Sequence, residues 1–116
     1  MMRTVRLELA RCHDFPEGSD KHGYEFRVPL TGAGKLDREG LHRHHEEATF
    51  HRFWGGDEDR GHIRHGHRGW ILAFAQDGDA DETLFKGDQH RFVPGEYVSI
   101  EERDGQTRTF RVASVH

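Results

Sequence analysis

Apolar and polar residues alternate along much of this chain. Every second residue is apolar in 4–11 and again in 24–30, which is the pattern of a β-strand with one buried face. No segment shows a sustained helical periodicity, and glycines recur between the apolar stretches as they do in tight turns. Pro29 has no amide hydrogen for a sheet, so we expect the second strand to end there or to lie at an edge.

The remaining apolar stretches predict further strands, at 49–54, 62–76, 83–86 and 90–93, followed by a final pair. Within 62–76 we expect Trp70, Leu72 and Phe74 in the core, with Arg64 and Arg68 at the surface. Residues 36–47 predict a loop with an irregular strand, because Gly40 weakens a helix and the polar run after it has no apolar stripe. About eight short strands suit one domain over residues 1–116, a small antiparallel β-barrel or barrel-like sandwich.

The final two strands contain enough apolar residues to predict their register. A two-residue loop at 104–105 would send their apolar side chains to opposite faces, whereas a three-residue loop at 104–106 places them all on one face. Burial therefore favours the longer loop, with Gly105 in a left-handed conformation. The predicted pairs are Ile100 with Phe110, Val98 with Val112, and Glu102 with Arg108.

Composition limits the class of protein. Leucine, isoleucine, valine and phenylalanine supply 24 of 116 residues, just above the level at which disorder is expected. No apolar run approaches the roughly 20 residues of a membrane span, and residues 1–11 lack the continuous apolar core of a secretory signal. The single cysteine, Cys12, excludes an internal disulfide and is expected to be a buried thiol. We therefore expect a cytoplasmic protein without membrane contact.

Charge is spread evenly along the chain. Lysine and arginine total 17 against 21 acidic residues, a formal charge of -4. Because there is no basic arm, we expect no nucleic-acid partner. Arginine outnumbers lysine 14 to 3; this excess is typical of carboxylate or phosphate recognition, but codon use in a GC-rich genome produces it as well, and we favour that explanation.

Histidines are the unusual feature of the sequence, and seven of the eleven lie between residues 42 and 67. If strands 49–54 and 62–67 form a hairpin centred on Glu58, His51 faces His65, and His67 shares their face. The predicted metal ligands are then His51, His65 and His67, with His44 or Glu46 completing the set. Imidazoles without thiolate suit zinc, nickel or copper. The alternatives are an exposed polar strand pair, which we favour, and a pH-sensing surface.

No pair of residues forms a recognisable nucleophile and base, and no loop matches a cofactor-binding motif. We therefore predict no catalytic residue and no required cofactor. The leading hypothesis is a non-enzymatic binding or accessory module that meets an unknown protein partner through its surface. The alternative is a histidine-rich metal-binding β-barrel protein, and a metal-dependent enzyme is one form of this alternative. A third hypothesis is self-association through exposed strand edges.

Overall fold

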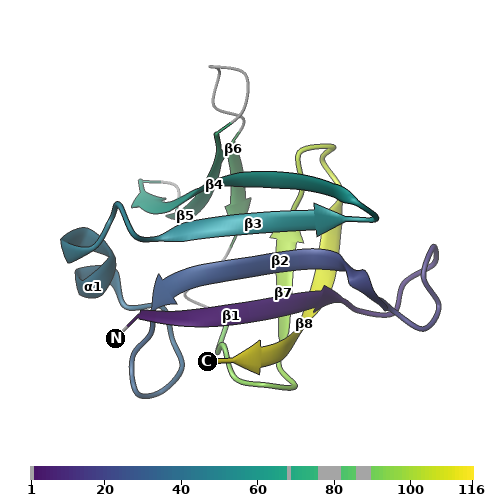
Figure 1. The fold of residues 1–116 in the computed structure, drawn as a ribbon, viewed down its shortest axis with the longest axis horizontal. Coiled ribbons are helices and arrows are strands. Elements are labelled where there is room, and N and C mark those ends of the chain that lie inside the picture. The colour runs from purple at the N-terminus through teal and green to yellow at the C-terminus, as the bar shows by residue number, and fades with distance from the viewer. Residues whose placement is uncertain (1, 68, 76–81, 86–89) are drawn as a thin grey trace.

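The alternating strands form one antiparallel sheet that closes into a barrel (Figure 1). The computed structural model describes residues 2–67, 69–75, 82–85 and 90–116, and within these ranges it has eight strands and one short helix. The elements are β1 (Met2–Leu9), β2 (Ser19–Pro29), α1 (Arg38–Arg43), β3 (Thr49–Trp54), β4 (Asp57–Gly66), β5 (Gly69–Phe74), β6 (Glu82–Phe85), β7 (Tyr97–Glu101) and β8 (Thr107–Val115). The predicted fold class is confirmed.

Each strand pairs with the next along the chain, and β8 returns to pair with β1. The narrowest seam lies between β6 and β7, where Phe85 and Ile100 are the paired residues in the described part of the chain. Closure gives every described strand a neighbour on both sides, so the free strand edges expected for self-association are not present among them. Self-association by another surface stays an untested prediction.

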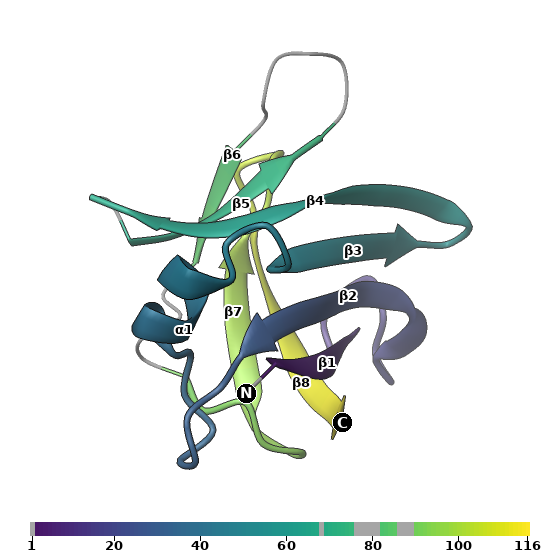
Figure 2. The same cartoon turned by 60° about the vertical axis from the view of Figure 1, so that its left-hand side comes forward.

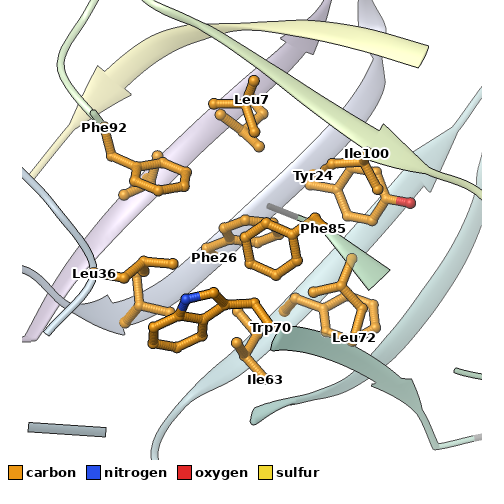
Figure 3. Close-up of a cluster of buried hydrophobic side chains, with 14 of the residues drawn as sticks. Leu7, Tyr24, Phe26, Leu36, Ile63, Trp70, Leu72, Phe85, Phe92 and Ile100 are labelled. Atoms are coloured by element: carbon orange, nitrogen blue, oxygen red, sulfur yellow. The ribbon is translucent and has the colours of Figure 1, made fainter. Parts of the chain in front are cut away.

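The barrel interior is filled by apolar side chains from every strand (Figure 3). Trp70, Leu72 and Phe74 are buried as predicted, and Arg64 is exposed as predicted. Arg68 lies outside the described residues. Cys12, in contrast, is exposed, because it lies in the connection after β1 rather than on an inward-facing strand position.

Two pairs of glycines divide the middle of the chain differently from the prediction. Gly55 and Gly56 have φ angles of 58° and 105°, which form a two-residue turn, so β4 begins at residue 57 instead of 62. Gly66 pairs with Gly69, so the predicted single strand over 62–76 is a hairpin of β4 and β5. The pattern of apolar residues does not reveal this change of chain direction, because the polar half of 62–76 passes into the apolar half without a break in the sequence.

Residues 36–47 contain helix α1, which the sequence analysis placed in a loop with an irregular strand. The Asp37 carboxylate accepts a hydrogen bond of 3.1 Å from the Gly40 amide and caps the helix. Leu41 anchors the helix in the core with 5% of its surface exposed. Gly40 favours this packing, because a Cβ there would lie 2.8 Å from Pro29 Cβ. Figure 2 shows α1 beside one end of the barrel.

The predicted strand at 90–93 is irregular chain, not a strand. Phe92 is nonetheless buried, and its amide donates a hydrogen bond of 2.7 Å to the Gly34 carbonyl. This link ties the connection before β7 to the loop that precedes α1.

The predicted faces of β7 and β8 are confirmed, because Val98, Ile100, Phe110 and Val112 are all buried in the core. Their pairing differs by two residues: Val98 faces Phe110, and Ile100 faces Arg108. The loop is 103–105, with Gly105 at its third position and a φ of 84°. A three-residue hairpin loop needs its left-handed residue at that third position, and this need moves the loop back by one residue.

Substituting Gly61 with alanine should destabilise the barrel by about 3 kcal/mol, because the interior has no room for the methyl group. A Cβ at Gly61 would lie 2.0 Å from the Ala73 carbonyl oxygen, which belongs to the neighbouring strand. The matched control is Gly32→Ala, where nothing lies within 4 Å. Urea unfolding of both variants checks the prediction, and equal free energies of unfolding would refute it.

Candidate functional site

The structure separates the predicted metal ligands. His51 faces Arg60 in the β3–β4 hairpin, not His65, because the turn has only two residues. Its Nε2 lies 2.9 Å from Glu58 Oε1. His65 lies near the end of β4, where its ring packs edge-on against Trp70 with 4.9 Å between centroids. The predicted register of this hairpin was wrong.

The other three predicted ligands are His44, Glu46 and His67. His44 ends α1, and its Nδ1 is 2.9 Å from Glu47 Oε2. Glu46 and His67 are exposed, one after α1 and the other after β4. Within the described ranges, no three histidine, cysteine, aspartate or glutamate side chains are arranged to hold a metal ion. Binding of zinc, nickel or copper stays a prediction, and no contact among the described residues favours it.

His65 instead contributes to an open cleft between α1 and β4, which we call the α1–β4 cleft. Its volume is about 590 Å³, within the roughly 300–1,000 Å³ typical of small-molecule sites. All but one of its lining residues are polar or charged. The lining residues are Arg38, Glu39, Leu41, His42, Arg43, His45, Arg64 and His65.

Strand and helix geometry explain why these side chains meet. On β4, Ile63 points into the core, and His65 follows it on the same face at the end of the barrel. On α1, Arg38 and His42 are four residues apart and share one helix face. Because α1 packs beside β4, its polar face and the end of that strand become the two walls of one cleft.

The charge of the α1–β4 cleft is opposite to that of the whole chain. Three arginines and one glutamate line it, a formal charge of +2 before any imidazole is protonated, on a chain whose formal charge is -4. Arg38 and Arg43 are exposed, and neither forms an ion pair or side-chain hydrogen bond with another described residue. Their guanidinium groups therefore face solvent with donors available for an anion.

A second groove, at the ends of β1 and β8, has the opposite charge balance, and we call it the β1–β8 groove. Its volume is about 890 Å³, and its charged lining residues are Glu8, Glu17, Asp20, Arg11 and Arg111. Their formal sum is -1. The two concavities therefore differ in the sign of the formal charge of their lining residues.

A buried ion cluster occupies the barrel end where β3 finishes, and we call it the Glu102 cluster. The Glu102 carboxylate, 5% exposed, accepts a hydrogen bond from the Tyr24 hydroxyl. Arg52 donates to both of its oxygens at 3.1 and 3.2 Å. Arg108 donates to Glu102 at 3.4 Å and to Asp104 at 3.0 Å. These hydrogen bonds join β2, β3 and β8 to the connection between β7 and β8.

The indole of Trp54 packs against the Glu102 cluster. The Arg52 guanidinium lies 4.2 Å from its ring centroid and the Arg108 guanidinium 5.4 Å, within cation–π distance. His22 packs edge-on against the same indole at 4.7 Å. Partial burial, and secondarily the Arg52 charge, lower the pKa of His22. These contacts hold the Glu102 cluster in place on its solvent side.

Burial raises the pKa of Tyr24 above its ordinary value, and the negative charge of Glu102 adds to the shift. A raised folded-state pKa stabilises the protein below the unfolded value near 10, and that stabilisation is lost as pH rises further. In a Tyr97→Phe variant, Tyr24 is the only tyrosine. We expect its phenolate absorbance to appear together with alkaline unfolding, measured by circular dichroism. Phenolate formation in the folded protein would contradict this.

Sequence reasoning missed most of both sites. The cap at Asp37 and the apolar Leu41 four residues later were the available signals for α1, and without α1 there is no cleft. Glu102 was predicted to face Arg108 in the sheet, but Arg108 faces Ile100, and only its side chain reaches Glu102, at 3.4 Å. Glu102 also continues the inward alternation of Val98 and Ile100, a signal of its burial that was available.

No protein-family model matches this chain, and no curated protein or solved structure matches it either. In the part of the chain that the structure describes, no helix is long and apolar enough to cross a membrane.

Proposed function

We propose that this protein is a non-enzymatic binding module and that the α1–β4 cleft receives an anionic group of its partner. The observation that carries the proposal is the charge of the cleft, +2 on a chain of -4. The exposed guanidinium groups of Arg38 and Arg43 on the α1 wall of the cleft are suited to holding an anion, because arginine donates two parallel hydrogen bonds to carboxylate or phosphate.

The arrangement of the other candidate residues supports binding rather than chemistry. The Glu102 cluster is the most buried polar group described, but its carboxylate is already held by Tyr24, Arg52 and Arg108. Bound in this way, it stabilises the barrel end instead of offering a base to a substrate. A cytoplasmic setting, expected from the single cysteine, is part of the same proposal.

The test is calorimetric titration of citrate and phenyl phosphate into the wild-type protein and the Arg38→Ala/Arg43→Ala variant. We expect at least one anion to bind the wild type, and the double variant to bind it at least about tenfold more weakly, since each lost charge-assisted hydrogen bond contributes on the order of 1.5–3 kcal/mol. Binding should also weaken as potassium chloride is raised, because exposed charges are screened by salt.

The matched control is Arg11→Ala/Arg111→Ala, which removes the same two charges from the β1–β8 groove. It should bind like the wild type, because its cleft is unchanged. Equal weakening in both double variants would show that only overall charge matters. That result, or the absence of binding by either anion, would overturn the proposal.

A further inference from the structure

We infer that the β1–β8 groove binds a short neutral saccharide, a ligand class distinct from the anion proposed for the α1–β4 cleft. The two concavities lie on different parts of the molecule: in Figure 1, α1 is at the left, and the connection between β1 and β2 is at the right. Three features of the groove carry the inference: its elongated floor with an exposed aromatic ring, its unpaired charged side chains of both signs, and a wall held by hydrogen bonds.

The floor of the groove is a row of outward-facing side chains on three neighbouring strands. Glu8 of β1 pairs with Arg111 of β8, and Arg111 pairs in turn with Tyr97 of β7. Because neighbouring strands lie about 4.8 Å apart, the row spans about 10 Å from Glu8 to Tyr97. An elongated ligand such as a disaccharide can lie along this row and contact all three side chains.

Tyr97 supplies a flat apolar surface at one end of the floor. Its exposed fraction is 58%, and among the large apolar side chains that the structure describes it is the exposed one. A pyranose ring carries weakly positive C–H groups on its face, and the negative face of an aromatic π system attracts them. Tyr97 can therefore stack against one sugar ring while the hydroxyls at the edge of that ring stay free for hydrogen bonds.

The charged side chains of the groove offer both donors and acceptors. Four of them are exposed and have no ion pair or side-chain hydrogen bond with another described residue: Arg11, Arg111, Glu17 and Asp20. Guanidinium groups only donate and carboxylates only accept, whereas a hydroxyl does both. Because the formal sum of the lining charges is only -1, the groove favours a neutral ligand rich in hydroxyls over a multiply charged one.

Hydrogen bonds hold the wall that β2 adds to the groove. Ser19 Oγ lies 2.7 Å from His22 Nδ1, and the Arg6 guanidinium of β1 donates to the Asp20 carbonyl at 2.8 Å. Because these contacts fix the backbone at 19–22, less freedom is lost when the Asp20 carboxylate takes up a ligand. The volume of about 890 Å³ leaves space for a disaccharide between this wall and the floor.

The experiment titrates maltose, cellobiose and lactose, and as a fourth ligand the zwitterion glycylglycine, separately into the isotope-labelled full chain. Backbone amide signals are followed by nuclear magnetic resonance. At least one disaccharide should give saturable shifts concentrated at 8–11, 17–20, 97 and 109–111. Its affinity should not change as potassium chloride is raised, because a neutral ligand has no charge whose attraction salt would screen.

Two variants of Tyr97 test the stacking contact. Tyr97→Ala should weaken binding of that disaccharide at least about fivefold, whereas Tyr97→Phe, which keeps the ring, should bind within about twofold of the wild type. The Arg38→Ala/Arg43→Ala variant should bind the disaccharide like the wild type, because its β1–β8 groove is unchanged.

The absence of saturable shifts with all three disaccharides would show that the inference is wrong. Equal affinity of Tyr97→Ala and the wild type would show the same. Shifts with glycylglycine but with no disaccharide would assign the groove to a zwitterionic ligand instead. None of these results bears on the anion proposed for the α1–β4 cleft, which is tested with other ligands and other variants.

Discussion

Ile100→Asp should destabilise the protein by more than about 4 kcal/mol, a large part of the roughly 5–15 kcal/mol available to a small domain. Ile100 has no exposed surface and lies opposite Phe85 across the narrowest seam of the barrel. A carboxylate at this position would be buried without a partner. Circular dichroism and urea unfolding should reveal a largely unfolded or strongly weakened protein.

Ser99→Asp is the matched control for this substitution. It introduces the same carboxylate one residue earlier, where the side chain points outward toward Thr109. Its effect should remain within about 0.5 kcal/mol, as for most surface substitutions. If Ser99→Asp unfolded the protein and Ile100→Asp did not, the assignment of inner and outer faces to β7 would be reversed.

Glu102→Ala should lower the free energy of unfolding by about 3–5 kcal/mol, because removing one partner of a buried ion pair leaves the other charge uncompensated. The variant leaves the Arg52 guanidinium without the two oxygens to which it donates. It also leaves the buried Tyr24 hydroxyl without its acceptor. Arg108 keeps its bond to Asp104, so Arg52 and Tyr24 account for most of the loss.

Glu101→Ala provides the comparison. Glu101 is the exposed neighbour of Glu102, so this substitution removes the same type of side chain from the surface. It should change the free energy of unfolding by less than about 0.5 kcal/mol. Similar losses in the two variants would mean that the Glu102 cluster contributes nothing beyond an ordinary surface charge.

The barrel could be predicted because apolar and polar residues alternate in much of the chain. Residues 4–11 and 24–30 need only period two to assign their buried faces, and the faces of β7 and β8 followed from burial in the same way. The residues that pair across neighbouring strands were harder to predict, because pairing depends on the geometry of the turn between the strands. One left-handed glycine, Gly105, moved the C-terminal pairs by two residues.

The candidate site was harder to predict because it depends on long-range placement. The histidine ligand set required a wide turn around Glu58, and the Gly55–Gly56 turn placed His51 opposite Arg60 instead. The α1–β4 cleft requires a six-residue helix whose stability comes from Asp37 and from the burial of Leu41. Such a short helix has too few turns to produce a periodic pattern of its own.

Mapping an anion onto the backbone amides by nuclear magnetic resonance tests the central claim most directly. Phenyl phosphate is titrated into isotope-labelled wild-type protein, and shifts of the amide signals are followed residue by residue. We expect saturable shifts concentrated in α1 and at 63–66, the two walls of the α1–β4 cleft. Shifts concentrated instead around 8–11 and 17–20, in the β1–β8 groove, or no saturable shifts at all, would contradict the account.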